Sequence, residues 1–302
     1  MKSLINLIKK ENLGTYKENV SFKKLTTYKT GGTARLVVLP YNTGALIKIL
    51  KYIKNNNIKY KIFGNGSNIL ASDKDYNGVI IKLTNLNNII INDNKIEVEA
   101  GYNFTNLCNQ MSKKGYSGLE FGGGIPATVG GAIYMNAGAY LESISSVVEK
   151  VDILDENMQI ITLSKSELQY GYRSSIFMKK NWIILKAYLK LKKYNKEEII
   201  DLIEDRKQRR IKTQPLEYPS AGSVFRNPKG MYAGKLIEDC NLKGFTYGGA
   251  QISDKHANFI INKNNATSSD IAYLMNLAKE KVKEKYNIDL YREQELFNFG
   301  DE

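Results

Sequence analysis

Two glycine-rich stretches are the first places where this sequence could do chemistry. Residues 118–140 read GLEFGGGIPATVGGAIYMNAGAY and hold seven of the chain's 24 glycines, and residues 64–68 read GNGSN. Glycine weakens regular structure, but its bare backbone lets another molecule approach closely, and successive N–H groups can surround a phosphate. Both stretches are therefore predicted to lie against a large, flat, phosphate-bearing ligand. Tight turns in a strand-rich domain would also explain them.

A nicotinamide-type dinucleotide fold is not expected at either stretch. GGGIPA at 122–127 formally matches G-x-G-x-x-A, and Glu142 follows at a suitable distance, but the preceding SGLEF is a poor strand. That fingerprint has meaning only between a strand and a helix of a β-α-β unit. The shorter loop lacks the Lys-Ser/Thr pair of a P-loop. What remains is a pair of loops that could each hold a ligand against main chain.

The two cysteines, the net charge and the length of the apolar runs exclude several classes of function. Cys108 and Cys240 show no metal-ligand spacing and are expected to be reduced and partly buried, and no metal site is predicted. The net charge is +13, but the lysines are spread along the chain, which favours small polyanionic ligands over nucleic acid. The apolar runs are far shorter than the roughly 20 residues of a membrane span. A cytoplasmic protein without a membrane or nucleic-acid partner is predicted.

Local patterns predict the elements that would position these loops. Helical spacing and alternation of apolar residues distinguish helices from strands, and Gly and Asn mark the breaks. Asn195 is expected to cap a helix, with Glu198 reaching back. The expected elements are helices over 1–10, 43–54, 104–115, 195–210 and 268–286, a strand ending at Pro40, strands at 59–63, within 78–101 and at 182–193, and a hairpin over 150–164. The core face of the last helix is predicted to contain Ile271, Leu274, Ala278 and Val282.

Six motifs in order give the sequence a specific resemblance. They are TTYKTGG (26–32), FGNGSNIL (63–70), the stretch 118–140, YGYRSSIF (170–177), SAGSVFRNP (220–228), and AGKLIEDCNLKG (233–244) with GGAQISDKHANFIIN (248–262). Together they resemble the UDP-N-acetylenolpyruvoylglucosamine reductases, the MurB family of flavoenzymes. The resemblance runs from about residue 20 to about residue 298, and its C-terminal motif is similar to the shorter class that lacks the extra loop.

The resemblance implies an α+β fold in three parts. A two-part FAD-binding module of the vanillyl-alcohol-oxidase (PCMH) type would cover 1–84 and 85–205, and a C-terminal α+β substrate-binding domain would cover 206–302. Because no His or Cys lies at either glycine loop, FAD is expected to be held non-covalently. A monomer is favoured. Another FAD-dependent oxidoreductase of the same fold, or a non-catalytic nucleotide-binding protein, remains the alternative.

The implied reaction reduces an enolpyruvyl double bond of a UDP-sugar, with NADPH as reductant, in peptidoglycan precursor synthesis. Arg173 would bind the substrate carboxylate, since a guanidinium suits a planar carboxylate, and Ser223 would be the proton donor. Glu293 would supply the carboxyl group, with Glu295 as the fallback. The sequence departs from the family pattern here, because Gln294 stands where the family prefers Val and Asn298 where it prefers Gly.

The resemblance also implies contacts for the cofactor and the substrate. The FAD contacts would be Gly64, Asn65, Gly66, Ser67, Asn68, Ile69, Gly124, Thr128 and Gly131. The substrate contacts would be Asn136, Tyr140, Asn227, Lys235 and His256. Other roles stay open for three of these: a core-edge aromatic for Tyr140, a surface salt bridge for Lys235, and a core-edge cap for His256.

Overall fold

The chain divides into two compact units, each with its own hydrophobic core. The computed structural model describes residues 1–300. Unit 1 contains residues 1–18, 36–65 and 78–208, and unit 2 contains residues 19–35, 66–77 and those from 209 onward. Buried aliphatic side chains form one cluster in unit 1 and a separate cluster in unit 2. Both units are assembled from segments that are distant in sequence, and the predicted three-part division of the chain stays a prediction.

The helices of unit 1 form where the sequence carries caps and apolar faces. Asn42 caps one of them, its side chain accepting the Ala45 N–H at 2.9 Å, and Asn103 caps another through the Asn106 N–H at 2.8 Å. Asn195 accepts the Glu198 N–H at 3.2 Å, as predicted. A side-chain oxygen at this position satisfies one of the N–H groups that a helix start leaves unpaired. The helices are α1 (Lys2–Lys10), α2 (Thr43–Asn55), α3 (Phe104–Lys113), α4 (Val129–Met135) and α5 (Lys196–Thr213), which continues past unit 1.

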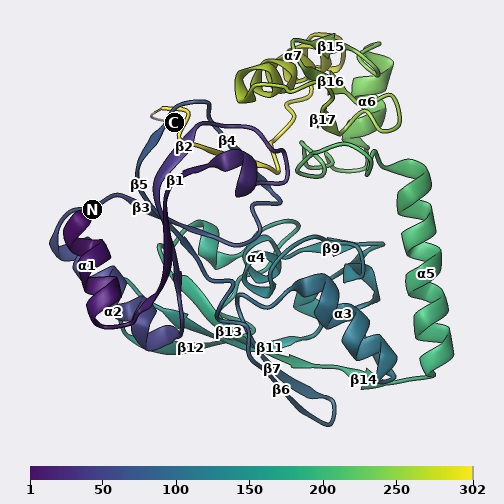
Figure 1. Ribbon diagram of the computed structural model, residues 1–302. Coiled ribbons are helices and arrows are strands. Elements are labelled where there is room, and N and C mark those ends of the chain that lie inside the picture. Colours follow the sequence, from purple (N-terminus) through teal and green to yellow (C-terminus); the bar gives the residue numbers. More distant parts are fainter. Residues whose placement is uncertain (301–302) are drawn as a thin grey trace. The chain divides into compact units, whose positions relative to one another are not determined.

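A five-stranded antiparallel sheet forms the centre of unit 1. Its strands lie in the order β12-β11-β13-β7-β6, and α4 packs against β13 and β7 (Figure 1). The strands are β6 (Ile89–Asn92), β7 (Lys95–Glu99), β11 (Val148–Leu154), β12 (Ile160–Ser164) and β13 (Ile183–Lys190). β11 and β12 pair as the predicted hairpin, with Lys150 opposite Ser164. The inward positions are apolar, for example Val98, Val151 and Ala187.

The first glycine loop follows β3, a strand of a second, four-stranded sheet. Its order is β1-β2-β5-β3, and β3 and β5 are parallel, with Tyr60 opposite Val79. The predicted strand–helix–strand order is confirmed as β2, α2 and β3, but β5 lies between the two strands in the sheet. The strands are β1 (Gly14–Ser21), β2 (Thr33–Pro40), β3 (Tyr60–Phe63) and β5 (Tyr76–Lys82).

Short elements complete unit 1 around the second glycine stretch. The segment SGLEF (117–121) was predicted to be a poor strand, and only its first residue, Ser117, belongs to one. The segment then continues into a 3₁₀ turn. The short strand pairs are β8 (Tyr116–Ser117) with β14 (Lys192–Lys193), and β9 (Gly138–Ala139) with β10 (Glu142–Ser143). The 3₁₀ turns are η2 (Glu120–Gly122), η3 (Ile144–Ser146) and η4 (Ile176–Met178).

Unit 2 packs two helices with a small sheet around its own core. α7 begins at a capping box between Thr267 and Asp270, and its buried face contains the predicted Ile271, Leu274, Ala278 and Val282. α7 contacts α6 and all three strands of the sheet (Figure 1). The elements are η1 (Phe22–Lys24), β4 (Ile69–Ala71), α6 (Ala233–Asp239), β15 (Thr246–Tyr247), β16 (Ala250–Ile252), β17 (Ile260–Asn262), α7 (Ser268–Tyr286) and β18 (Glu295–Phe297).

β18 and β4 form a separate parallel pair in unit 2, with Glu295 opposite Ile69. This pairing joins the chain's last strand to the strand that directly follows GNGSN. Within residues 1–300, none of the helices combines the length and the apolar character that crossing a membrane requires.

Candidate active site

The two glycine-rich stretches, predicted separately, meet within unit 1. A Cβ on Gly64 would lie 2.5 Å from the Thr128 hydroxyl, and the Asn65 side chain donates a hydrogen bond to the Pro126 carbonyl at 3.3 Å. Thr128 caps α4, because its hydroxyl accepts the Gly131 N–H at 3.2 Å. The end of the first loop therefore lies against the start of α4, and a side chain at Gly64 would prevent that approach.

The rest of the short loop has the geometry of an anion cradle. Gly66 has φ +65°, and a Cβ there would lie 2.2 Å from the Leu25 carbonyl oxygen. Across the described residues, no protein group accepts the N–H of Asn65, Gly66 or Ser67. Consecutive backbone N–H groups left unpaired at a turn are the donors that bind phosphate in other proteins. The loop thus has free backbone donors of the kind that a diphosphate needs.

Asn68 and Ile69 connect this loop to the C-terminal segment within unit 2. The Asn68 side chain donates to the Glu293 carbonyl at 2.9 Å, and the Asn68 carbonyl accepts the Glu295 N–H at 2.9 Å. Ile69 then pairs with Glu295 as β4 and β18 run side by side. The loop predicted to hold a cofactor and the segment predicted to hold the catalytic carboxyl are therefore bonded to each other.

Several glycines of the long stretch are needed for packing against protein. A Cβ on Gly122 would lie 2.5 Å from the Cys108 sulfur, and a Cβ on Gly118 would lie 2.8 Å from Val147. At Gly138 it would lie 2.2 Å from the Glu142 carbonyl oxygen. Close backbone approach, which the sequence predicted, is thus partly an approach of protein to protein. Gly124 is exposed.

Arg173 lies at a tight turn of unit 1 with its guanidinium directed back at the protein. Its φ is +51°, and its side chain donates to the Gly138 carbonyl at 2.5 Å. The Asn136 side chain donates to the Gly171 carbonyl at 2.8 Å and accepts the Ser145 N–H at 3.2 Å. Asn136, buried and itself at φ +44°, therefore holds the turn that carries Arg173.

Tyr140 forms a bridge from its hairpin to α5 in unit 1. Its hydroxyl donates to the Arg206 carbonyl at 3.0 Å, and the Arg206 guanidinium lies 4.7 Å from the Tyr140 ring centre. Arg206 also pairs with Glu142 at 2.7 Å. These contacts give Tyr140 a packing role, and the predicted substrate contact stays a prediction, with 39% of the residue exposed.

Ser223 and Glu293 are brought together in unit 2, while Arg173 belongs to unit 1. The Glu293 N–H donates to the carbonyl of Val224, the residue after Ser223, at 2.8 Å. Phe225 and Arg292 form a β-bridge at the same place, and the Arg226 N–H donates to the Tyr291 carbonyl at 2.9 Å. The serine segment thus pairs with the glutamate segment over three successive residues.

Sequence reasoning missed Asn258, which holds the other side of the serine segment. The Asn258 side chain accepts the Phe225 N–H at 3.0 Å and donates to the Phe225 carbonyl at 2.8 Å. Its own carbonyl accepts the Val224 N–H at 2.9 Å. Asn258 is buried, and a buried amide needs partners for both of its atoms. Its place two residues after the predicted His256, in HANF, was the available signal.

Two of the predicted substrate contacts lie on the surface of unit 2 near α6. The Asn227 side chain accepts the Ala233 N–H at 3.0 Å, at the start of α6. Lys235 pairs with Asp239 one turn further on at 2.7 Å. That hydrogen bond raises the pKa of Lys235 and lowers the pKa of Asp239. The surface salt bridge left open for Lys235 is therefore present.

His256 is half-buried against α6 and the Phe259 ring. A Cβ on Gly234 would lie 3.1 Å from the imidazole, and the ring centres of His256 and Phe259 are 4.9 Å apart. The Nδ1 atom accepts the Asn258 N–H at 3.2 Å. Burial lowers the pKa of His256 below its ordinary value of 6.5. The imidazole is therefore neutral at pH 7, with one nitrogen already bonded to the chain.

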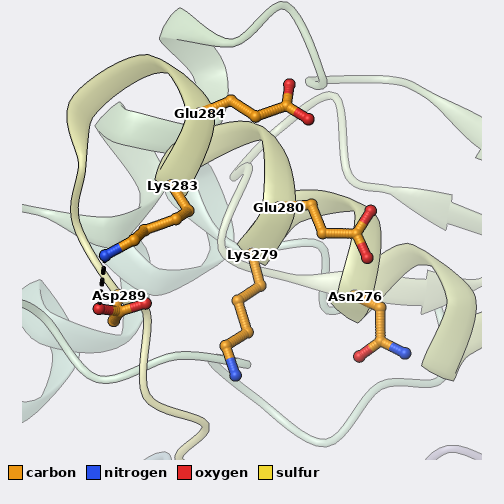
Figure 2. Close-up of a pocket in the computed structure, with 6 residues that line it drawn as sticks. All are labelled: Asn276, Lys279, Glu280, Lys283, Glu284 and Asp289. Atoms are coloured by element: carbon orange, nitrogen blue, oxygen red, sulfur yellow. Dashed lines mark hydrogen bonds and ion pairs between the residues drawn. The ribbon is translucent and has the colours of Figure 1, made fainter.

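Ser223 lines neither of two hollows on the surface of unit 2. Figure 2 shows one of about 390 Å³ along α7, where charged side chains of both signs face solvent and Lys283 pairs with Asp289 at 2.8 Å. The second, of about 490 Å³, is lined by Arg226, Lys279, Leu290, Tyr291, Arg292, Gln294, Glu295 and Leu296. Glu295 lines this second hollow and Glu293 does not, so the two candidate carboxyl groups have different surroundings.

Two family models match separate parts of this chain. Residues 34–164 match the family model described as FAD binding domain, and residues 214–297 match the C-terminal domain of UDP-N-acetylenolpyruvoylglucosamine reductase. The reductase of that name from Caldanaerobacter subterraneus is 46% identical over 91% of each chain, and that from Anoxybacillus flavithermus is 43% identical over 98% of this chain and 99% of its own.

A solved structure supports the fold as well. The crystal structure of UDP-N-acetylenolpyruvylglucosamine reductase (MurB) from Thermus caldophilus superposes with a TM-score of 0.80 at 33% identity, covering 94% of this chain and all of that one. The predicted α+β fold, with an FAD-binding module and a C-terminal domain, is thereby confirmed. On these similarities over nearly its whole length, the chain belongs to the UDP-N-acetylenolpyruvoylglucosamine reductase (MurB) family.

Proposed function

We propose that this chain reduces the enolpyruvyl group of UDP-N-acetylenolpyruvoylglucosamine to give UDP-N-acetylmuramate, using FAD and NADPH, in peptidoglycan precursor synthesis. The observation that carries the proposal is the pairing of the Ser223 segment with the Glu293 segment, through the Glu293 N–H and the Val224 carbonyl at 2.8 Å. This pairing occurs in a chain that is similar to such reductases along nearly its whole length.

FAD would be held non-covalently by the two glycine stretches. Asn65, Gly66 and Ser67 offer backbone N–H groups to its diphosphate, which suits a dinucleotide better than a neutral ligand. Gly64, Asn68, Ile69, Gly124, Thr128 and Gly131 are the further proposed contacts. When bound, FAD supplies the hydride that NADPH gives up.

Three side chains would stabilise the negative charge that develops on the substrate and supply the proton that the product needs. Negative charge develops on the carbon that bears the substrate carboxylate, and Arg173 would stabilise it through two parallel hydrogen bonds. Glu293, in its protonated form, would donate a hydrogen bond to the substrate carboxylate. Ser223 would then give its proton to that carbon, which is basic enough to accept it from a weakly acidic hydroxyl.

The substrate's sugar and diphosphate would contact Asn136, Tyr140, Asn227, Lys235 and His256. Exposure of the Lys235 and Asn227 side chains supports this for the diphosphate, since a cation and an amide donor suit phosphate oxygens. The tight contacts of Asn136 within its own unit make it a support for Arg173 as well. The cytoplasmic location and the monomeric state stay predictions.

The half-reactions of the purified flavoprotein test the proposal. NADPH should bleach the flavin absorbance, and the enolpyruvyl UDP-sugar should restore it without oxygen. In Ser223→Ala, bleaching should proceed at nearly the normal rate, while restoration should slow by at least about a hundredfold, as expected for loss of a proton donor. Ser220→Ala, which removes a hydroxyl three residues earlier, should change neither rate. Equal slowing of both half-reactions in Ser223→Ala would show that the serine has another role.

A further inference from the structure

A buried amide and a buried phenol lie directly behind the serine loop. Gln294 is 3% exposed and Tyr28 is fully buried. The Gln294 side-chain nitrogen donates to the Ala221 carbonyl at 3.1 Å and to the Gly222 carbonyl at 3.0 Å. Its side-chain oxygen accepts the Tyr28 hydroxyl at 2.9 Å. Both atoms of the Gln294 amide and the Tyr28 hydroxyl are therefore hydrogen-bonded within unit 2.

Tyr28 is itself fixed to the start of the same loop. Its carbonyl accepts a hydrogen bond from the Asn262 side chain at 3.0 Å, and the Asn262 N–H donates to the Pro219 carbonyl at 2.9 Å. Burial raises the pKa of the Tyr28 hydroxyl, so the hydroxyl keeps its proton and remains a donor to Gln294. The motif TTYKTGG, to which no role was assigned, thus reaches the serine loop from 219 to 222.

The loop depends on these polar contacts because packing does not hold its tip. Gly222 has φ +76°, and a Cβ built there would meet no atom within 4 Å. The two carbonyls that Gln294 binds are those of the peptides directly before Ser223. If they rotate, the direction in which the Ser223 side chain leaves the backbone changes with them.

We propose that Gln294, held by Tyr28, is a positioning residue that fixes the direction of the Ser223 hydroxyl for proton transfer. The proposal rests on the role proposed above for Ser223. Gln294 uses both the nitrogen and the oxygen of its amide in this brace, which an apolar residue of similar size could not do. Misplacement of a reacting group by about 1 Å can cost about a hundredfold in rate.

The test compares Gln294→Met, Tyr28→Phe and a matched control. Met keeps similar volume without the hydrogen bonds, and should slow reoxidation of reduced flavin by the enolpyruvyl UDP-sugar by about ten- to a hundredfold, with flavin reduction by NADPH unchanged. Tyr28→Phe removes one hydroxyl and should show a smaller effect of the same kind. Ser268→Ala removes another fully buried hydrogen bond of unit 2, to Thr30 at 2.9 Å, and should leave both rates unchanged.

Hydrogen–deuterium exchange of peptides covering 219–225 gives a readout that needs no substrate. Gln294→Met should raise exchange there, and Ser268→Ala should not. Unchanged exchange in Gln294→Met, or equal slowing of both half-reactions, would overturn the positioning role. If the unaltered protein failed to use the enolpyruvyl UDP-sugar, the proposed function would fall, whereas the exchange result would still decide whether Gln294 orders the loop.

Discussion

Replacing Asn258 with leucine should destabilise unit 2 through two specific groups. Leucine branches at the same carbon as asparagine but cannot accept the Phe225 N–H or donate to the Phe225 carbonyl, which the amide does at 3.0 and 2.8 Å. Phe225 is 2% exposed, so water cannot replace the lost partner. The backbone hydrogen bond from Val224 to the Asn258 carbonyl at 2.9 Å does not involve the side chain and would remain.

The expected loss follows from the two unpaired groups. A buried donor or acceptor without a partner costs about 1–3 kcal/mol, so the pair costs about 2–6 kcal/mol. Burying the apolar leucine offsets about 1–2 kcal/mol. We therefore expect the free energy of unfolding to fall by about 1–4 kcal/mol, which is large beside the 5–15 kcal/mol typical of a folded protein.

Asn258→Asp tests the same two hydrogen bonds, and it should make the stability of the protein depend on pH. Ionised, the carboxylate would face the Phe225 carbonyl with no proton between the two oxygens; protonated, it could donate as the amide does. Burial and this neighbour would raise the pKa of the new carboxyl above the ordinary value of about 3.9. The folded state would then bind more protons than the unfolded state, so stability relative to the parent would fall as pH rises through the folded pKa. The variant should match the parent more closely at pH 5 than at pH 8.

Urea denaturation followed by far-ultraviolet circular dichroism measures both effects. The single tryptophan, Trp182, lies in unit 1, so its fluorescence would report on the wrong unit. Asn264→Leu is the matched control, because Asn264 is exposed in the same unit and should change stability by less than about 0.5 kcal/mol. The reasoning fails if Asn258→Leu also lies within that margin, or if Asn258→Asp loses as much at pH 5 as at pH 8.

The remaining predictions concern the carboxyl group and the histidine. Glu293→Gln should slow reoxidation of reduced flavin by the enolpyruvyl UDP-sugar at least about tenfold more than Glu295→Gln; stopped-flow absorbance measures both, and the reverse order would move the assignment to Glu295. The pKa of His256 is lowered in the folded state, so the unfolded state binds more protons and stability should fall as pH drops below about 6.5. His256→Asn, which keeps an acceptor near the Asn258 N–H, should reduce that fall in urea titrations; an unchanged slope would show that other groups cause it.

Elements with local signals were predictable, and elements that depend on distant pairing were not. α7 has the predicted bounds because its apolar face repeats at helical spacing, and α5 begins after the predicted cap, Asn195. β4 and β18 are only three residues long, and each becomes a strand by pairing with the other. No pattern inside either segment specifies a partner more than 200 residues away, so the sequence contained no signal for this sheet.

The glycine stretch shows what this type of signal can and cannot indicate. Clustered glycine correctly predicted that something approaches the backbone closely. Composition alone does not distinguish a ligand from the protein's own atoms, and at Gly118, Gly122 and Gly138 the approaching atoms are protein. The GNGSN loop differs, because Asn65, Gly66 and Ser67 keep backbone donors that no described residue accepts.

The structural roles of two buried amide side chains could not be predicted from the sequence either. Asn258 and Gln294 are each 3% exposed and together bind four backbone groups of residues 221–225 through their side chains. An amide in a sequence is more often exposed than buried, so its residue type predicted no structural role.

These contacts have a consequence for how Ser223 could act as an acid. Both backbone groups of Val224 are occupied, by Asn258 and by Glu293, and the two carbonyls before Ser223 are occupied by Gln294. The serine is thus placed by its neighbours, while its hydroxyl makes no hydrogen bond to any described residue. Because no described residue is hydrogen-bonded to this hydroxyl as a base, only a strongly basic carbon could take its proton. If Ser223 is the proton donor proposed above, the loop fixes its position in advance, while release of the proton depends on charge developing in the substrate.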